Sequence, residues 1–341
     1  MKQNTKEQVL RALSEAEGFL SGQELSNLLG VSRTAVWKAI GKLKEEGYEI
    51  EAVTNKGYRL AHDQETDILN RTEIEKRLTT IWAGHPVFCK KETGSTNDDI
   101  MKLADEGAAQ GTLVVADHQT AGKGRRGRTW ISPEGENVYM SILLRPHIPV
   151  SEAPMMTLIM ALAAYDAMQD LDLPKNLRFG IKWPNDLVVS VNGGSYKKFV
   201  GILTEMRLED AEIKDVTIGI GLNLNQEAVS EEIAETATTL YLAAGEKVSR
   251  AAAAACCWNH FEPDYEEYLE AGSLKPLLAR YSSALVNIGR KVRILDPKGE
   301  YTGTAKAVTE GGELVVTPDD GGEDRCIGTG EISVRGVMGY V

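Results

Sequence analysis

The segment TAGKGRRGRTW, residues 120–130, concentrates positive charge in a chain whose net charge is -12. It holds four cations, Lys123, Arg125, Arg126 and Arg128, and its glycines spell the pattern GxGxxG. A dinucleotide-binding loop of that pattern follows a strand directly, opens a helix and precedes an acidic residue by about twenty positions. None of these conditions holds here, and Lys123 precedes Gly rather than the Ser or Thr of a P-loop. The segment therefore argues against both standard nucleotide-binding folds.

The charge and glycine content of residues 120–130, called the basic loop below, predict another role. Like charges repel one another, so we expect the loop to be mobile until an anion neutralises it. A small anionic ligand is the simplest partner. A contact to nucleic acid and an ordinary solvated loop are the alternatives.

The composition is that of a globular chain with more than one domain. Its 341 residues exceed one typical domain, and 42% of them are hydrophobic. The four cysteines show no CxxC spacing, which favours reduced thiols over a zinc site or a disulfide framework. The N-terminus has no signal-peptide core, and the apolar run at 155–168 is too short and polar for a bilayer span. We expect a cytoplasmic protein that makes no membrane contact.

Residues 1–60 differ from the remainder in charge and in pattern. They hold nine Lys/Arg against eight Asp/Glu, a net of +1, and the remainder holds 29 against 42, a net of -13. Apolar spacing predicts helices over 5–17, after the capping box at Ser21–Glu24, and over 32–47 with Ser32 as N-cap. A hairpin pattern follows around Asn55-Lys56-Gly57.

This order of elements is typical of a winged helix-turn-helix domain, in which the third helix enters the major groove and the wing approaches the phosphates. A small helical domain with a solvated charged face is the alternative. The residues that we expect at the DNA are Ser32, Arg33, Thr34, Trp37, Lys38, Asn55 and Lys56.

The remaining sequence alternates strand and helix patterns. Strands are predicted at 111–119, 137–146, 177–189, 198–206 and 215–225, with a long helix at 151–171, which indicates a mixed sheet covered by helices. Short alternating strands after about residue 289 indicate a small barrel. We therefore expect a DNA-binding domain at 1–62, a linker at 63–70, a catalytic domain at 71–286 and a C-terminal domain at 287–341.

Five segments occur in the order found in biotin protein ligases. They are ETGSTND (92–98), DHQTAGKGRRGRTW (117–130), KWPND (182–186), KFVGILTE (198–205) and IGIGLNLN (218–225). With the N-terminal pattern, the whole chain resembles the bifunctional members, which are also repressors of the biotin operon. The resemblance implies an α+β multidomain protein. Its parts would be a winged helix-turn-helix domain, a central α/β ligase domain with a mixed sheet like that of class II aminoacyl-tRNA synthetases, and a C-terminal SH3-like small β-barrel. Lys123 departs from the arginine that is common at that position, so bidentate contacts there are not expected.

The resemblance also implies a reaction. Biotin and ATP would give biotinyl-5'-adenylate and pyrophosphate, and the biotinyl group would then pass to a lysine of the biotin carboxyl carrier protein of acetyl-CoA carboxylase. The adenylate would also serve as corepressor and favour a homodimer on operator DNA. Mg²⁺ is expected with ATP because it bridges phosphates, but no sequence pattern nominates a dedicated metal site.

The matched motifs imply three overlapping sets of site residues. The biotin-binding set is Ser95, Thr96, Asn97, Gln119, Gly122, Lys123, Gly124, Arg125, Lys198 and Gly201. The nucleotide-binding set is Arg125, Arg128, Trp130, Asn185 and Asn223. The catalytic set is Arg125, Arg128, Lys182, Asp186 and Lys198, with Asp186 orienting or deprotonating the acceptor lysine. Hydroxyls and an amide suit a neutral urea, and cations offset the charge that accumulates at a phosphate.

Each of these motifs also has a purely structural interpretation. Ser95–Asn97 can form a helix N-cap, Lys198 can be a surface lysine and Asn185-Asp186 can form an Asx turn. Two other functions remain as alternatives. One is a lipoate-type ligase, and the other is a ligand-sensing transcriptional regulator without ligase activity.

Overall fold

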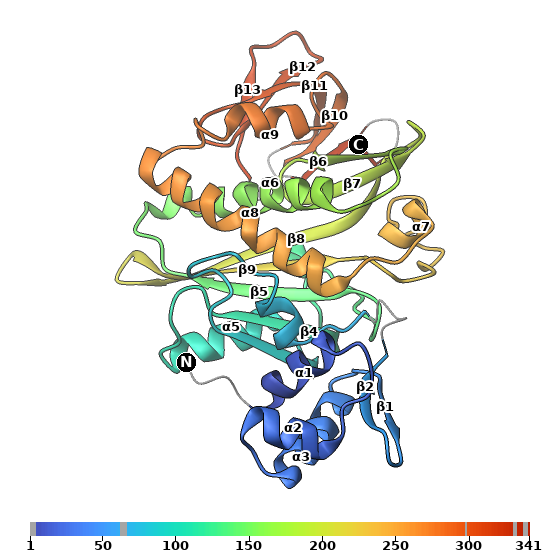
Figure 1. Ribbon diagram of the computed structural model, residues 1–341. Helices are drawn as coiled ribbons and strands as arrows, with labels where there is room; N and C mark the ends of the chain where they lie inside the picture. Colours follow the sequence, from blue (N-terminus) through green and yellow to red (C-terminus); the bar gives the residue numbers. More distant parts are fainter. Residues whose placement is uncertain (1–4, 62–66, 297–298, 330–332, 337–339) are drawn as a thin grey trace. The chain divides into compact units, whose positions relative to one another are not determined.

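The computed structural model describes residues 5–61, 67–296, 299–329, 333–336 and 340–341 (Figure 1). The chain divides into two compact units that meet in sequence between Lys76 and Arg77. Residues 63–66 of the predicted linker lie outside the described residues, and helix α4 (Arg71–Glu75) belongs to the first unit. The four predicted domain ranges therefore stay predictions.

The first unit has the predicted order of three helices and a hairpin. These elements are α1 (Thr5–Glu15), α2 (Gly22–Leu29), α3 (Arg33–Glu45), β1 (Ile50–Val53) and β2 (Gly57–Leu60). The capping box is confirmed, because Ser21 Oγ accepts from the Glu24 amide and the Glu24 carboxylate accepts from the Ser21 amide. Ser32 caps α3 in the same way, by accepting from the Ala35 amide at 3.2 Å. Local side-chain acceptors thus fix where α2 and α3 begin.

One apolar core holds the first unit together. Leu13 of α1, Leu25 of α2 and Leu43 of α3 are fully buried in it. The opposite face of α3 is solvated, and the Trp37 side chain there is 67% exposed. All seven residues that were predicted to contact DNA are exposed, five on α3 or its N-cap and two in the β1–β2 turn. Asn55 has φ 66°, a left-handed conformation that a short polar side chain tolerates.

A seven-stranded sheet is the centre of the second unit, with the order β3-β4-β5-β9-β8-β7-β6. Its strands are β3 (Val87–Thr93), β4 (Leu113–Gln119), β5 (Val138–Leu144), β6 (Leu177–Lys182), β7 (Asp186–Val191), β8 (Lys197–Glu209) and β9 (Glu212–Leu222). Strands β3 and β4 pair in parallel, and the other neighbours are antiparallel. The predicted mixed sheet is confirmed. Strand β3 was not predicted because its run FCKKE lacks an apolar alternation.

Helices cover the two faces of this sheet differently. Helices α6 (Met155–Asp170) and α8 (Arg250–Ala271) lie side by side on one face (Figure 1), where Thr157 bonds Thr204 and Trp258 contacts Met140. Helix α5 (Thr96–Asp105) and the basic loop lie on the other face. Short helices α7 (Leu240–Ala244) and α9 (Leu278–Ala284), with 3₁₀ turns η1 (Arg125–Gly127) and η2 (Val150–Glu152), complete this region.

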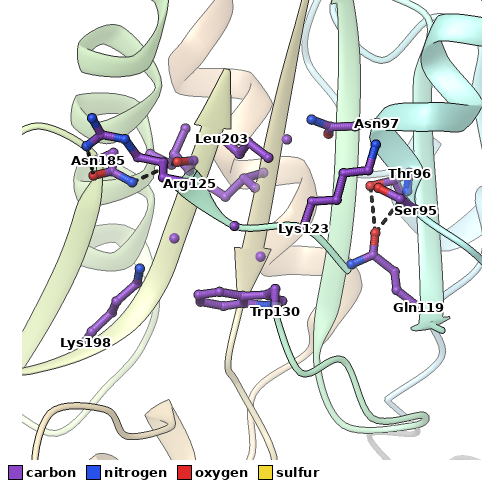
Figure 2. Close-up of a pocket in the computed structure, with 16 residues that line it drawn as sticks. Ser95, Thr96, Asn97, Gln119, Lys123, Arg125, Trp130, Asn185, Lys198 and Leu203 are labelled. Atoms are coloured by element: carbon purple, nitrogen blue, oxygen red, sulfur yellow. Dashed lines mark hydrogen bonds between the residues drawn. The ribbon is translucent and has the colours of Figure 1, made fainter. Parts of the chain in front are cut away.

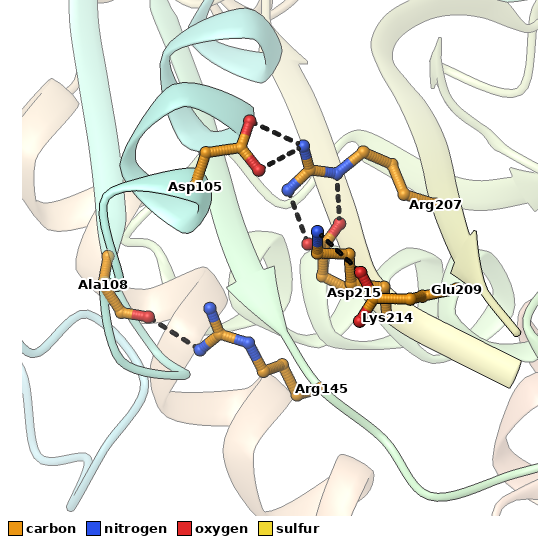
Figure 3. Close-up of polar contacts among 7 residues, drawn as sticks. All are labelled: Asp105, Ala108, Arg145, Arg207, Glu209, Lys214 and Asp215. Atoms are coloured by element: carbon orange, nitrogen blue, oxygen red, sulfur yellow. Dashed lines mark hydrogen bonds and ion pairs between the residues drawn. The ribbon is translucent and has the colours of Figure 1, made fainter.

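Arg207 ties α5 to the β8–β9 hairpin (Figure 3). Its guanidinium donates to both Asp105 oxygens at 2.9 Å and to Asp215 at 2.9 and 2.6 Å. The Asp215 side chain is 2% exposed, so its charge depends on this bidentate partner. Nearby, Lys214 pairs with Glu209 at 3.2 Å and Arg145 donates to the Ala108 carbonyl at 2.7 Å. This network fixes the C-terminal end of the helix whose N-terminal end faces the candidate site.

We expect Arg207→Ala to lower the free energy of unfolding by about 3 kcal/mol, because Asp215 would stay buried without its partner. Urea denaturation monitored by circular dichroism measures this change. Lys214→Ala is the matched control, since its partner Glu209 is exposed and such a surface pair contributes little. Equal midpoints for the two variants would contradict the role given to Arg207.

A five-stranded antiparallel sheet follows, with the order β13-β12-β11-β10-β14. Its strands are β10 (Lys291–Leu295), β11 (Tyr301–Val308), β12 (Leu314–Pro318), β13 (Arg325–Ile327) and β14 (Ser333–Gly336). The sequence predicted all of them except β13, which has only three residues. Residues 331–332, the start of the last predicted strand, lie outside the described residues. Across the described ranges, no helix combines the length and apolarity needed to cross a membrane.

Candidate functional site

Two adjoining pockets open on the sheet face that carries α5 and the basic loop. The inner pocket has a volume of about 50 Å³ (Figure 2). It is lined by Ser95, Thr96, Asn97, Gln119, Lys123, Gly124, Arg125, Trp130, Asn185, Lys198, Gly201, Ile202, Leu203, Gly219, Ile220 and Gly221. The outer pocket has a volume of about 550 Å³. Its lining includes Arg125, Arg128, Trp130, Lys182, Asn185, Asp186, Lys198, Asn223, Arg335 and Tyr340.

A buried polar network forms one end of the inner pocket. Gln119 Oε1 accepts from the amide and hydroxyl of Thr96 at 2.9 and 3.2 Å (Figure 2). Ser141 donates to Thr96 Oγ1 and Asn97 Oδ1, and Asn97 donates to Glu205 at 2.6 Å. Ser95 occupies the N-cap position of α5, but its side chain makes no capping hydrogen bond. The capping interpretation therefore leaves the buried Ser95 hydroxyl unexplained.

Trp130 forms the floor that both pockets share, and two glycines make room for it. Gly201 of β8 pairs with Gly221 of β9 across the sheet. A Cβ atom would meet the Trp130 ring at 2.7 Å from Gly201 and at 2.6 Å from Gly221. Only glycine leaves space for an indole this close to the backbone. The buried Trp130 Nε1 has no hydrogen-bond partner among the described residues, so a ligand can accept from it.

The basic loop has protein partners that the sequence pattern did not indicate. Lys123 pairs with Asp98 of α5, and this contact raises the pKa of the Lys123 ammonium. Arg125 donates to Asn185 Oδ1 at 3.0 Å and to the Thr329 carbonyl at 2.7 Å. Burial lowers the pKa of the Arg125 guanidinium, which still remains charged at neutral pH. Arg126 and Arg128 are exposed.

Charged groups from three strands meet in the outer pocket. Lys198 Nζ lies 2.5 Å from Asp186 Oδ1, and its ammonium lies 5.0 Å from the centre of the Trp130 ring. Lys182 is only 5% exposed, and burial lowers its pKa to about 8. Burial also acts to raise the pKa of Asp186, but Lys198 and Lys182 outweigh it, so that the pKa falls below its ordinary value. Asp186 is therefore ionised at neutral pH.

The structure brings most of the predicted site residues together. Gly122 is the exception, because it lines neither pocket. A Cβ there would collide with the Trp130 carbonyl, so Gly122 serves the close packing of the basic loop. The bend predicted at Pro184 is confirmed as the connection between β6 and β7, and its peptide bond to Trp183 is cis.

Sequence reasoning missed several residues at the site, including four that hold the basic loop or line the outer pocket. Asp98, Thr329, Arg335 and Tyr340 contact the basic loop or line the outer pocket. Only Asp98 lies in a motif, ETGSTND, and its charge next to the predicted biotin set was the one available signal. The other three come from the C-terminal domain, where no motif pointed to them.

One group of potential metal ligands lies elsewhere among the described residues, although the sequence nominated none. Asp170 of α6 and Cys256 and His260 of α8 place ligand atoms within 4.8 Å of one another. His260 Nε2 already lies 2.7 Å from Asp170 Oδ2. A hydrogen bond between His260 and Asp170, on the helical face of the sheet, accounts for this group.

Comparisons with known proteins identify the family. The model of the biotin/lipoate A/B protein ligase family matches residues 91–223. An HTH domain model matches residues 5–59, and the model of the biotin protein ligase C terminal domain matches residues 288–335. Each of the three matched regions corresponds to a part of the fold described above.

Relatives extend over almost the whole chain. It is 39% identical to the bifunctional ligase/repressor BirA of Bacillus subtilis, over 94% of this chain and 96% of that protein. It is 30% identical to the BirA of Escherichia coli, over 98% and 99% of the two chains. The structure of biotin protein ligase from Aquifex aeolicus in complex with biotin and ATP matches with a TM-score of 0.61 and 30% identity, over 73% of this chain and 98% of that one. The chain therefore belongs to the biotin protein ligase family, among its bifunctional ligase/repressors.

Proposed function

We propose that this chain forms biotinyl-5'-adenylate from biotin and ATP, transfers the biotinyl group to a lysine of the biotin carboxyl carrier protein of acetyl-CoA carboxylase, and represses the biotin operon with the adenylate as corepressor. One observation carries the enzymatic part. A small pocket with a buried polar end opens into a larger cationic pocket, and Arg125, Trp130 and Lys198 line both. A carboxylate held at the junction would face a bound phosphate.

The inner pocket suits biotin. A urea both donates and accepts hydrogen bonds, and the hydroxyls of Ser95 and Thr96 with the Gln119 amide offer both functions. Apolar side chains of Ile202 and Leu203 line the same pocket and suit the thioether ring and the valeryl chain. The hydrogen bonds among Thr96, Gln119 and Ser141 exist before the ligand enters, so little ordering is needed on binding.

The outer pocket suits ATP, which enters as its Mg²⁺ complex and brings the metal with the substrate. Arg125, Arg128, Lys182 and Lys198 supply positive charge for the phosphates. The buried side-chain oxygen of Asn223 has no partner among the described residues and would accept from the amino group of adenine. The Aquifex aeolicus ligase, solved with biotin and ATP, supports this pairing of ligands.

The first step joins the two ligands. An oxygen of the biotin carboxylate attacks the α-phosphorus, a new P–O bond forms, and the bond to pyrophosphate breaks. The chain supplies no nucleophile. It holds two anions together and offsets the growing charge with Arg125, Lys182 and Lys198. Closure of the basic loop would keep water from the mixed anhydride.

The second step is acyl transfer. The amine of the acceptor lysine attacks the biotinyl carbonyl carbon and an amide bond forms. The bond from that carbon to the anhydride oxygen breaks, AMP leaves with this oxygen, and the amine proton is released to solvent. The lowered pKa of Asp186 makes it a weak base, so we assign it chiefly the orientation of the incoming amine.

Several finer assignments belong to the same proposal. The largely antiparallel central sheet supports a likeness to class II aminoacyl-tRNA synthetases, and the five-stranded C-terminal sheet supports an SH3-like barrel.

The protein would bind operator DNA as an adenylate-bound homodimer, through the exposed residues of α3 and the β1–β2 turn. We place the protein in the cytoplasm, where its four free cysteines stay reduced.

Labelled substrates test the catalytic part. The full chain is incubated with biotin and α-labelled ATP, and a carrier domain is then added. We expect labelled biotinyl adenylate first, followed by release of AMP and biotin on one carrier lysine, and lipoate in place of biotin should give no product. Biotin binding without pyrophosphate release would instead identify a regulator without ligase activity.

A truncated chain tests the division of labour. We expect proteins that begin at residue 63 or at Arg77 to biotinylate the carrier domain and to lose operator binding. The Aquifex aeolicus ligase supports this, since almost all of it matches 73% of this chain. The two starting points are compared because α4 belongs to the first unit. A folded truncated protein that makes no adenylate would refute the division.

Operator titration tests the corepressor. A dimer presents two recognition helices to a palindromic site, whereas a monomer presents one. Neutralisation of the basic loop by the adenylate would favour the dimer, so operator affinity should rise when biotin and ATP are added. Sedimentation should show dimers under the same conditions, and an excess of carrier protein should release the operator. Equal operator affinity with and without the adenylate would falsify the coupling.

A further inference from the structure

Tyr340, near the C-terminal end of the described residues, lines the outer pocket. Tyr340 Oη donates a hydrogen bond of 2.6 Å to Asp186 Oδ2. The Lys182 ammonium lies 3.4 Å from the centre of the same ring. One C-terminal side chain therefore touches both charged groups of the KWPND segment, which lies more than 150 positions earlier in the sequence.

Each contact restrains a group that the two reaction steps use. Lys198 already holds Asp186 Oδ1 at 2.5 Å, so the Tyr340 hydroxyl on Oδ2 fixes the second oxygen and with it the plane of the carboxylate. Lys182 is buried, and an aromatic face stabilises a desolvated ammonium more strongly than an exposed one. The tyrosine thus has a polar function at its hydroxyl and a separate electrostatic function at its ring.

We propose that Tyr340 is a positioning residue for both steps of the reaction. Its hydroxyl orients Asp186 toward the acceptor lysine, and its ring holds the Lys182 ammonium at the phosphate of ATP. This assignment rests on the function proposed above and adds a residue that no motif contains. It also gives the C-terminal domain a direct part in the chemistry.

Burial and the neighbouring charges set the pKa of Lys182, and the Tyr340 ring acts against those that lower it. Burial lowers the pKa of Lys182 most, Asp186 of β7 raises it, and Lys198 of β8, Arg335 of β14 and Arg128 of the basic loop lower it again. Loss of the aromatic face should lower this pKa further. Burial and then Asp186 raise the pKa of the Tyr340 hydroxyl well above its ordinary value, so that it remains a neutral donor.

Two substitutions separate the hydroxyl from the ring. Tyr340→Phe keeps the ring on Lys182, so single-turnover adenylate formation should stay close to the wild-type rate. Transfer to the carrier lysine should slow by about tenfold to a hundredfold, the range for a lost hydrogen bond to a charged group. Tyr340→Leu should slow both steps. It should also move the alkaline limb of kcat/KM for ATP to lower pH by about one unit, because the neutral form of Lys182 gains population.

Tyr301→Leu is the matched control. Its ring also faces a cation, with the Arg325 guanidinium at 4.5 Å, on a strand of the same C-terminal sheet, but it lines neither pocket. We expect wild-type rates for both steps in this variant. Wild-type protein measured in parallel tests the proposed function separately.

Three results would overturn the proposal. The first is a wild-type rate of transfer in Tyr340→Phe. The second is a loss of activity in Tyr340→Leu that a smaller fraction of folded protein fully explains, while the pH profile of kcat/KM for ATP stays unchanged. The third is faster turnover in Tyr340→Leu, which would make the tyrosine an inhibitor of the site.

Discussion

Lys198→Ala should lower kcat/KM for adenylate formation about a hundredfold, the upper range for one lost hydrogen bond to a charged ligand. Lys198 lines both pockets, contacts Asp186 at 2.5 Å and faces the Trp130 ring. Its removal takes away a cation between the biotin carboxylate and the ATP phosphates. It also leaves Asp186, whose side chain is 13% exposed, with fewer cationic neighbours, which raises the pKa of that carboxyl.

The neighbouring Lys197 supplies the control for this prediction. It precedes Lys198 on β8, and its ammonium donates to the Ala234 carbonyl at 2.6 Å, outside both pockets. Lys197→Ala removes the same charge from the same strand, so it should keep nearly full adenylate formation. Pyrophosphate release and thermal unfolding are measured for both variants. If both variants keep nearly the wild-type rate, Lys198 is not part of the site. If both lose activity to the same extent, the cause is a general effect of charge.

The sequence predicted features that depend on neighbouring residues. The capping box at Ser21–Glu24 and the cap at Ser32 each join residues three positions apart, and the structure contains both. The resemblance to a family predicted more than neighbouring residues could. Its motifs indicated which side chains line the two pockets, although the sequence does not show how their strands pair. The register that sets Gly201 beside Gly221 follows from sheet topology, which no local pattern encodes.

Contacts over long sequence separations escaped prediction. Arg125 reaches Asn185 across 60 positions and Thr329 across 204. Its charge predicted an anionic partner, but a cation can equally be held by neutral carbonyl and amide oxygens once folding brings them near. Tyr340 gave no signal because a tyrosine near the end of a chain matches no chemical pattern. Such residues are recognised only when the elements that carry them are placed in space.

Gly221→Val should weaken binding of biotin and of the adenylate by at least about a hundredfold, because the shared floor of the two pockets would move. The added Cβ would lie 2.6 Å from Trp130 Nε1 and 2.8 Å from Cε2, distances that real Cβ atoms do not adopt. The indole must therefore leave its place above Gly201 and Gly221. A β-branched residue suits the interior of β9, so the fold should survive.

A double-mutant cycle with Trp130→Ala isolates the cause of this effect, with ligand affinity measured by calorimetry. If the valine acts by displacing the indole, it should cost little affinity in the chain that already lacks the indole, and the two changes will be far from additive. Gly328→Ala serves as a control, since a Cβ at that position meets nothing within 4 Å. Additive losses would mean that Gly221 acts on the ligand directly. The indole would then be only one of several groups that contact the ligand. The glycine pair would be needed because the ligand itself lies close to the backbone of the two strands.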